Sequence, residues 1–209
     1  VELSRDAIAR LDSDIRAFAH VAEDPAISDE GPLAGIAIGI KDIFDTYDQP
    51  TTYGSRAYAE HQPATDAAIV ALARRRGATI IGKTVTTEFA YFEPGATVNP
   101  HNHAHTPGGS SSGSAAAVAA EMVPLAVGTQ TNGSVIRPAS FCGVFGFKPT
   151  HGLVSRTGIL KQSPPLDTVG VFGRSVEDAA LLADAITAFD DRDPHSRLRA
   201  RPALLETAT

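Results

Sequence analysis

The sequence predicts an α/β fold whose central sheet is largely parallel. Short apolar runs typical of buried strands alternate with segments of helical periodicity, and short Gly-rich connections join them without any internal repeat. Successive parallel strands need a crossover, which is usually a helix. The order strand, helix, strand therefore favours helices layered on a parallel sheet.

The first element is a helix. Apolar side chains recur at spacings of three and four, with charged residues between them: Ile8, Leu11, Ile15, Phe18 and Val21. This spacing places them on one face of an amphipathic helix of about five turns. We expect this face to serve packing.

The second element is a strand within residues 31–42. Ile36, Ile38 and Ile40 alternate with small residues, so one face of the strand is apolar and the other lets backbone approach closely. Lys41 ends this strand. A lysine held in apolar surroundings loses hydration, which lowers its pKa from ~10.4 toward neutrality and makes it a candidate general base.

A helix and a second strand follow. Asp66 is the expected N-cap of the periodic segment 67–76, whose last turn is basic and which Gly77 terminates. The run 78–84 then predicts a buried strand. We expect Lys83 in this run to form an ion pair with Glu88, or one of the two to act as a cap.

Further along, an alanine-rich helix over 115–120 follows a run of serines and glycines, and Ser175 opens a helix that continues to about residue 189. An apolar strand-like segment, 124–127, leads into a turn built from residues 131–134. From Asp190 the polar sequence loses its periodicity, which indicates a loop or linker.

The composition excludes several classes of protein. Of 209 residues, 43% are hydrophobic and 20% charged, a balance that supports a folded core. Eighteen Lys and Arg stand against 24 Asp and Glu, a net charge of −6 without a basic stripe, so we expect no nucleic-acid partner.

The single cysteine, Cys142, excludes an internal disulfide and fits a cytoplasmic location. No apolar stretch approaches the ~20 residues of a membrane span, so we expect no membrane contact. The chain opens without methionine, and we expect it to be a fragment.

The run of small polar residues before the alanine-rich helix suggests a binding site, because no packing need for it is evident in the sequence. A phosphate-binding loop would need Lys and then Ser or Thr after its last glycine, whereas Ser114 and alanines follow Gly113. Gly109, Ser111 and Gly113 also satisfy the G-x-S-x-G pattern of a hydrolase nucleophile elbow. That elbow must follow a buried strand, and here the polar loop 101–108 precedes it.

Two further chemistries have candidate residues. His101, His103 and His105 alternate as metal ligands can, but they lie in a loop with no acidic ligand or cysteine nearby, and we expect no metal. No histidine is placed to activate either serine-bearing turn. A serine bridging Lys41 to a nucleophilic serine would relay the proton instead, as in the Ser-Lys variants of the catalytic triad.

Four ordered segments resemble the motifs of the amidase signature enzymes: GPLAGIAIGIKD (31–42), GGSSSGSAAAVAA (108–120), GTQTNGSVIRPASFCG (128–143) and GFKPTHGLVS (146–155). The resemblance spans residues 31–186. It implies a mixed, largely parallel sheet with helices on both faces. We interpret residues 1–209 as a single domain, incomplete at its C-terminal end and forming an N-terminal portion of a longer chain.

The resemblance also implies a cofactor-free hydrolysis of a small carboxamide through an acyl-enzyme. Lys41 would be the base, Ser110 the bridging serine with a cis peptide bond, and Ser134 the nucleophile. Backbone N–H groups of Thr131, Asn132, Gly133 and Ser134 would form the oxyanion hole. Gly109, Ser111, Gln130 and Arg137 complete the expected site, with Ser111 supporting the bridging serine.

Three positions depart from the usual family pattern. Asn132 replaces the first of two glycines, Gln130 replaces a commoner acidic residue, and Arg137 stands three rather than two positions after Ser134. These features resemble the malonamidase branch. The planar guanidinium of Arg137 would suit a substrate carboxylate, which favours half-amides of small diacids such as malonamate.

Two other functions stay open. One is the amidase subunit of a tRNA-dependent amidotransferase, which would act with partner subunits. The other is a noncatalytic amidase-like scaffold, suggested by Asn132. A small-molecule amide is the expected partner, and a homodimer is a candidate assembly.

Overall fold

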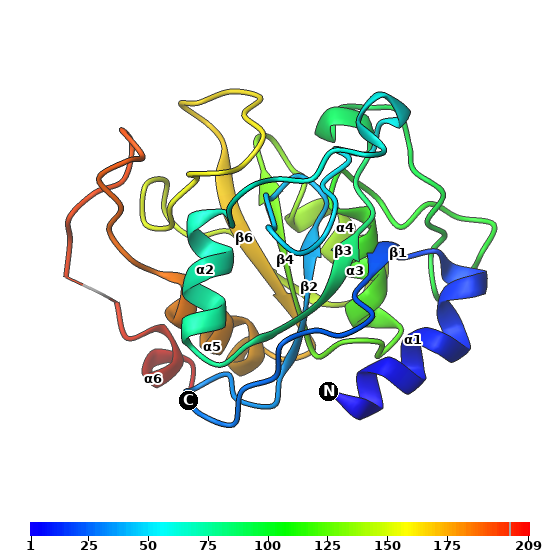
Figure 1. Ribbon diagram of the computed structural model, residues 1–209, viewed down its shortest axis with the longest axis horizontal. Coiled ribbons are helices and arrows are strands. Elements are labelled where there is room, and N and C mark those ends of the chain that lie inside the picture. Colours follow the sequence, from blue (N-terminus) through cyan, green and yellow to red (C-terminus); the bar gives the residue numbers. More distant parts are fainter. Residues whose placement is uncertain (201) are drawn as a thin grey trace.

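A six-stranded mixed sheet forms the centre of the molecule, in the order β1-β3-β2-β4-β6-β5. The computed structural model describes residues 1–200 and 202–209, and Figure 1 shows helices packed around this sheet. The strands are β1 (Phe18–Val21), β2 (Ala37–Lys41), β3 (Thr79–Thr84), β4 (Leu125–Gln130), β5 (Phe145–Phe147) and β6 (Thr168–Gly173).

The strand directions divide the sheet into a parallel centre and antiparallel edges. Strand β2 pairs in parallel with β3 and with β4. The pairings β1 with β3, β4 with β6 and β5 with β6 are antiparallel. The predicted α/β fold with a mixed sheet is confirmed, and its parallel character is confined to the three central strands.

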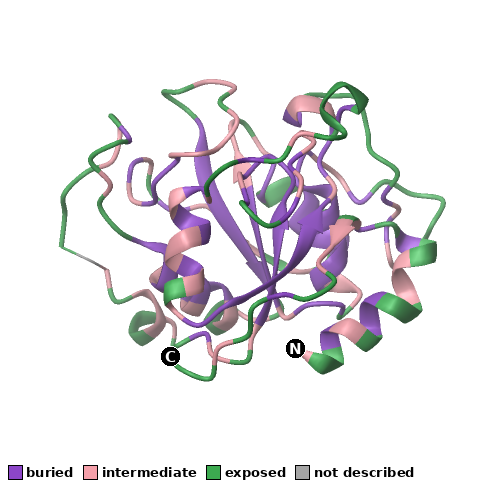
Figure 2. Cartoon of the chain, in the orientation of Figure 1, coloured by how far each residue is buried: buried purple, intermediate pink, exposed green. Residues whose placement is uncertain are grey.

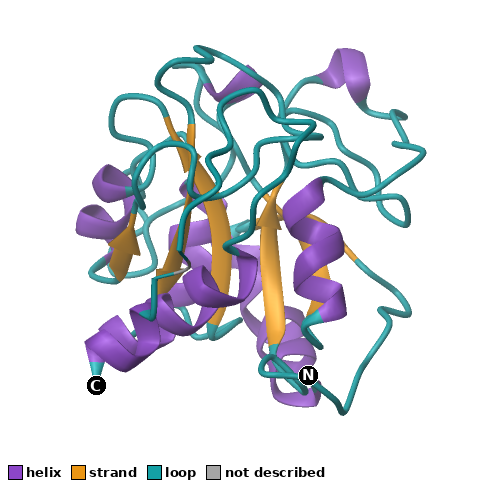
Figure 3. Cartoon of the chain, turned by 90° about the vertical axis from the view of Figure 1, so that its left-hand side faces the viewer, coloured by secondary structure: helices purple, strands orange, loops and turns teal. Residues whose placement is uncertain are grey.

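Helices cover both faces of the sheet (Figure 3). One core cluster joins α2 (Ala68–Arg75) and α5 (Val176–Ile186) to residues such as Ile38, Ile40 and Val127. The other joins α1 (Glu2–Ile15), α3 (Ser112–Ala119) and α4 (Ile136–Cys142) to small residues of the strands, including Ala37 and Ala126. The predicted division of β2 into an isoleucine face and a small-residue face is confirmed. Figure 2 shows the central strands of the sheet, β2 among them, as buried.

The opening helix is shorter than predicted. It ends at Ile15, and Arg16 takes a left-handed conformation with φ 56°. The Asp12 carboxylate accepts the backbone N–H groups of Ala17 and Phe18, at 2.7 and 3.2 Å, which turns the chain out of the helix. Phe18 and Val21 therefore lie in β1, where they pair with β3, because the edge of β3 offers a ladder of backbone partners that the helical periodicity does not reveal.

The predicted cap of α2 is wrong, and its predicted end is confirmed. Ala67 occupies the N-cap position, while the Asp66 carboxylate binds Arg74 Nε at 3.0 Å. Gly77, with φ 92°, terminates the helix as expected. Lys83 also has a different partner from the one predicted: it forms a buried ion pair with Asp42 at 3.1 Å.

The C-terminal part of the fold begins as predicted. Ser175 Oγ accepts the N–H of Asp178 at 3.0 Å and caps α5. The polar loop beyond Asp190 is tied to the body by the ion pair of Arg156 with Asp193, at 2.8 Å. A short helix that the sequence pattern did not predict, α6 (Leu204–Ala208), then packs against α5.

Two short 3-10 helices complete the fold, η1 (Arg56–Tyr58) and η2 (Glu88–Ala90). Within the described residues, no helix is both long and apolar enough to cross a lipid bilayer.

Candidate active site

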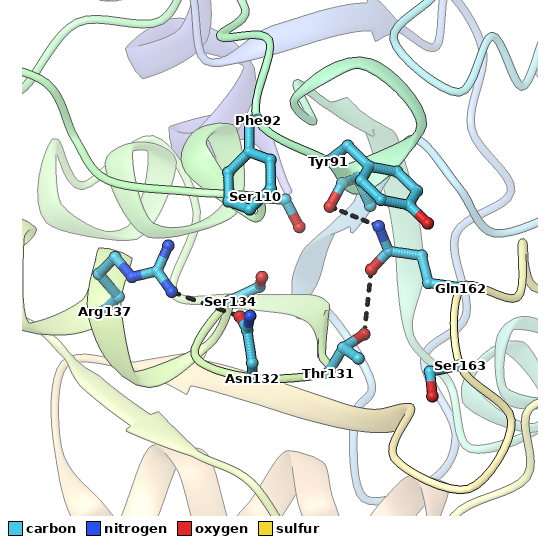
Figure 4. Close-up of a pocket in the computed structure, with 10 residues that line it drawn as sticks. Tyr91, Phe92, Ser110, Thr131, Asn132, Ser134, Arg137, Gln162 and Ser163 are labelled. Atoms are coloured by element: carbon cyan, nitrogen blue, oxygen red, sulfur yellow. Dashed lines mark hydrogen bonds between the residues drawn. The ribbon is translucent and has the colours of Figure 1, made fainter.

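A pocket of about 140 Å³ opens at the edge of the sheet where β2 and β4 end. The carboxyl ends of parallel strands commonly form binding sites in open α/β sheets. Figure 4 shows the side chains around it. The pocket is lined by Ala90, Tyr91, Phe92, Ser110, Thr131, Asn132, Ser134, Arg137, Gln162 and Ser163.

Lys41, the last residue of β2, lies fully buried beneath this pocket. Its Nζ donates to Ser110 Oγ at 2.7 Å and to Thr129 Oγ1 at 2.9 Å. Burial disfavours the charged ammonium and lowers the pKa of Lys41 to about 7, while the negative charge of Asp167 opposes that shift. Near neutral pH a large fraction of this amine is unprotonated and able to accept a proton.

Two serine hydroxyls face the pocket from different segments. Ser110 precedes α3, is joined to Gly109 by a cis peptide bond, and lies within hydrogen-bond distance of Lys41. Ser134 lies in the turn between β4 and α4 and is 7% exposed. Figure 4 shows both side chains directed into the same space. The structure thus brings Lys41, Ser110 and Ser134 together from three separate motifs.

The serines at the start of α3 serve packing, which corrects the expectation that no packing need explains them. Ser111 Oγ bonds with both the N–H and the carbonyl of Thr129, and Ser114 Oγ donates to the carbonyl of Val127 at 2.9 Å. A Cβ on Gly113 would lie 2.2 Å from the carbonyl oxygen of Ala17. Small residues are required here because α3 lies directly against strands.

Gln130, an expected substrate-binding residue, holds the start of α4 after the turn 131–134 instead of lining the pocket. Its Oε1 accepts the N–H groups of Val135 and Ile136, both at 3.0 Å. These are N–H groups at the start of α4, which lack partners within the helix. Gly109 and Ser111 are likewise absent from the lining of the pocket, next to Ser110.

The backbone of the turn is suited to binding an oxyanion. Within residues 1–200 and 202–209, the structure shows no protein hydrogen bond for the N–H groups of the four expected donors, Thr131, Asn132, Gly133 and Ser134. Unpaired donors beside a nucleophile can stabilise the negative charge of a tetrahedral intermediate.

Arg137 lies at the opposite side of the pocket from Gln162 (Figure 4). Its Nη2 lies 3.4 Å from Asn132 Oδ1, and its exposed guanidinium passes over Gly133. A Cβ on Gly133 would meet Nη2 at 2.6 Å, so a side chain at this position would displace the guanidinium from its present place. Asn132 and Gly133 together seat the guanidinium beside Ser134.

Sequence reasoning missed several residues of the site: Tyr91, Phe92, Gln162 and Asp167. Thr131 Oγ1 lies 2.6 Å from Asp167 Oδ1 and 3.0 Å from Gln162 Oε1. Tyr91 and Phe92 form the rim. The only sequence signal was Asp167, a carboxylate placed directly before the apolar run of β6.

His101, in the histidine-containing loop, and the buried Cys142 make contacts that serve the fold. His101 Nε2 bonds with the carbonyl of Cys142 at 2.8 Å. Burial raises the pKa of the Cys142 thiol to about 12, so it is unreactive at neutral pH. The described residues contain no group of three or more His, Cys, Asp or Glu arranged to hold a metal.

Comparison with known proteins places this chain in a family. The model of the Amidase family matches residues 6–208. The chain belongs to the Amidase family.

Its relatives in this family include amide hydrolases and a component of an amidotransferase. One subunit of the glutamyl-tRNA(Gln) amidotransferase of Legionella pneumophila (strain Corby) is 42% identical over 224 aligned positions, covering 97% of this chain and 46% of that protein. The crystal structure of the same subunit from Thermotoga maritima has a TM-score of 0.91 at 38% identity, covering 95% of this chain and 45% of the other. The peptide amidase of Stenotrophomonas maltophilia has a TM-score of 0.87 at 35% identity, covering 97% and 47%.

The chain spans about half the length of the relatives it matches. Its membership of the Amidase family accords with the resemblance seen in its motifs.

Proposed function

We propose that this Amidase-family chain carries the catalytic centre of an enzyme that releases ammonia from a small primary carboxamide. The contact between the buried Lys41 amine and the Ser110 hydroxyl, beside Ser134 in one pocket, carries this proposal. A neutral lysine linked to a serine is a base that can activate a second serine.

In the proposed acylation step, Ser134 Oγ attacks the amide carbonyl while its proton passes to Ser110, whose own proton passes to Lys41. The carbonyl oxygen gains negative charge and accepts hydrogen bonds from the free N–H groups of Asn132, Gly133 and Ser134. Each such donor is worth about 3 kcal/mol in the transition state. Collapse of the intermediate breaks the C–N bond, and the proton held by Lys41 returns through Ser110 to the leaving nitrogen as ammonia departs.

Deacylation reuses the same groups. Water attacks the Ser134 ester, its proton passes to Lys41 through Ser110, and the second tetrahedral intermediate breaks its bond to Ser134 Oγ. The proton returns to Ser134, and the carboxylic acid leaves. All of the groups in this cycle belong to the chain itself.

Two substrates fit the proposed site, and they share a carboxylate. The named relatives favour the amide-donor side of a tRNA-dependent amidotransferase, working with partner subunits. The exposed guanidinium of Arg137 in the pocket favours a small half-amide such as malonamate. Glutamine and malonamate both combine a primary amide with a carboxylate that Arg137 would bind.

A serine-directed fluorophosphonate tests the catalytic centre without a known substrate. We expect label on Ser134 of the unmodified chain and its loss in Lys41→Met and Ser110→Ala. Ser111→Ala is the matched control, since Ser111 bonds to Thr129 and does not line the pocket. Label on Ser111 would return the nucleophile-elbow interpretation, and no label would favour the noncatalytic scaffold.

Ammonia release then separates the two substrates. Turnover of malonamate by the isolated chain supports the stand-alone amidase. Turnover of glutamine that appears only with copurified partner subunits supports the amidotransferase function.

A further inference from the structure

The side-chain amide of Gln162 connects two segments that border the pocket. Its Nε2 donates to the carbonyl oxygens of Phe89 and Ala90, at 3.1 and 2.7 Å. Its Oε1 lies 3.0 Å from Thr131 Oγ1, and the single proton of that hydroxyl is shared with Asp167 Oδ1 at 2.6 Å. Figure 4 shows Gln162 between Tyr91 and the turn that carries Thr131 and Ser134.

Tyr91 and Phe92 belong to the segment 87–93, which we call the rim of the pocket. This segment has an unfavourable backbone. Phe89 and Ala90 have φ values of 47° and 58°, a left-handed conformation that residues with a Cβ rarely adopt. Such backbone persists only where surrounding contacts hold it. Two such contacts are the N–H of Phe89 bound to the carbonyl of Tyr53, at 2.8 Å, and Thr87 Oγ1 bound to the carbonyl of Tyr91, at 2.7 Å.

The rim is also joined to the bridging serine. The N–H of Thr87 donates to the carbonyl of Ser110 at 3.1 Å. One end of the rim is therefore fixed to Ser110, and Gln162 and Asp167 connect the other end to Thr131, three residues before Ser134. Together these bonds join Ser110, the rim and the turn 131–134 along the pocket opening.

The orientation of the Gln162 amide is determined by its neighbours. Its NH₂ group must face Phe89 and Ala90, since an amide oxygen there would oppose two carbonyl oxygens. Asp167 holds the backbone of the same residue, because its Oδ2 accepts the N–H of Gln162 at 2.9 Å. Gln162 is thus fixed at both its backbone and its side chain.

We infer that Gln162 is a positioning residue that sets the width of the pocket and so limits the size of the acyl group admitted. Tyr91 and Phe92, 60% and 84% exposed, have few contacts of their own to hold them over the opening. Bonds within the segment, such as Thr87 Oγ1 with the carbonyl of Tyr91, hold its shape, and the two carbonyls that Gln162 binds attach it to the rest of the site. This inference rests on the proposed function for its meaning, and its structural part is testable without activity.

Gln162→Glu in the full chain is the direct test, because it preserves shape and replaces the two donors with an oxygen that repels the rim. Gln62→Glu is the matched control: its amide donates to the carbonyls of Thr46, Tyr47 and Gln49, away from the pocket. Two fluorophosphonates, one with an ethyl and one with a biphenyl group, measure size selectivity as inactivation rate and inhibitor affinity. Hydrogen exchange of the peptide 87–93 measures the rim directly.

For Gln162→Glu we expect the hydrogen-exchange rate of the peptide 87–93 to rise at least tenfold. We also expect the ratio of the labelling rates, biphenyl probe over ethyl probe, to rise about tenfold, because the biphenyl probe binds more tightly. Gln62→Glu should change neither quantity. Unchanged exchange, or altered exchange with unchanged selectivity, would overturn the inference. If Gln162→Glu does not fold, the neutral Gln162→Met supplies the same comparison. If no form of the chain is labelled, the proposed function fails, and exchange alone decides whether Gln162 holds the rim.

Discussion

At the scale of single residues, the proposed chemistry depends most on the protonation state of Lys41. Burial lowers the pKa of this amine to about 7, and only the neutral amine can accept the serine proton. We expect the rate of Ser134 labelling to rise as pH increases from 6 to 8 and then to level off. Labelling rates in buffers of constant ionic strength would show this. A rate that is flat across this range, or that rises only near pH 10, would contradict the assignment of Lys41 as the base.

Asn132 is the second residue on which a prediction depends. Its Oδ1 lies 3.4 Å from Arg137 Nη2, the only side-chain hydrogen bond of that guanidinium within the described part of the chain. Asn132→Gly removes this contact and gives the turn the glycine usual in the family. We expect the KM for malonamate to rise about three- to tenfold, because a long hydrogen bond to a charged group is worth about 1 kcal/mol, while kcat is maintained.

A neutral amide of similar size, such as propionamide, is the control for Asn132→Gly, since it has no carboxylate for Arg137. An equal change in KM for both amides would show that Asn132 acts on the turn itself and does not act through Arg137.

At the scale of elements, the junction between β4 and α4 determines where Ser134 lies. Gln130 ends β4, and its Oε1 holds two N–H groups at the start of α4. Gln130→Leu removes both bonds, and we expect Ser134 labelling to slow about tenfold or more. Gln130→Glu keeps the acceptor oxygens and should label within about threefold of the unmodified chain. Similar losses in both variants would mean that the amide N–H groups of Gln130, and not its oxygen, matter.

The elements also show what sequence can predict. Ile36, Ile38 and Ile40, Gly77 and Ser175 were interpreted correctly because alternation, a left-handed stop and a cap are local properties. Phe18 fitted the helical spacing equally well, and the decision lay with the unpaired edge of β3, which is distant in sequence. The intrinsic helix or strand propensity of a residue carries no information about a pairing partner that is distant in sequence.

The same distinction applies to the candidate site. Lys41, Ser110 and Ser134 could be proposed because each belongs to a motif. Gln162 and Asp167 have no motif of their own, and their importance comes from contacts with Thr131 and the rim that only the folded chain provides. Ser111 and Ser114 misled for the opposite reason, because their packing against β4 is invisible in sequence.

At the scale of the whole molecule, a buried ion pair lies at the carboxyl ends of β2 and β3, and one of its members directly follows the proposed base in sequence. Lys83 of β3 and Asp42, which follows Lys41, are both almost fully buried. The Lys83 ammonium also donates to Thr51 Oγ1 at 2.6 Å and to the carbonyl of Pro50 at 3.1 Å. Burial lowers the pKa of Lys83, and the charge of Asp42 opposes that shift. The pair thus joins β3 to the segment that leaves β2.

Removing one charge of this pair should destabilise the whole fold. Lys83→Met leaves the Asp42 carboxylate buried without its cation, at a cost of about 3–5 kcal/mol in the free energy of unfolding. The double variant Asp42→Asn, Lys83→Met removes both charges, and we expect it to recover most of that loss, because it leaves no uncompensated charge in the interior. Urea unfolding of the two single variants and the double variant gives the coupling free energy, with Lys161→Met, an exposed lysine, as the control. Additive losses would show that Lys83 and Asp42 are stabilised independently, so that Lys83 is held by Thr51 and Pro50 and the ion pair does not couple β3 to the end of β2.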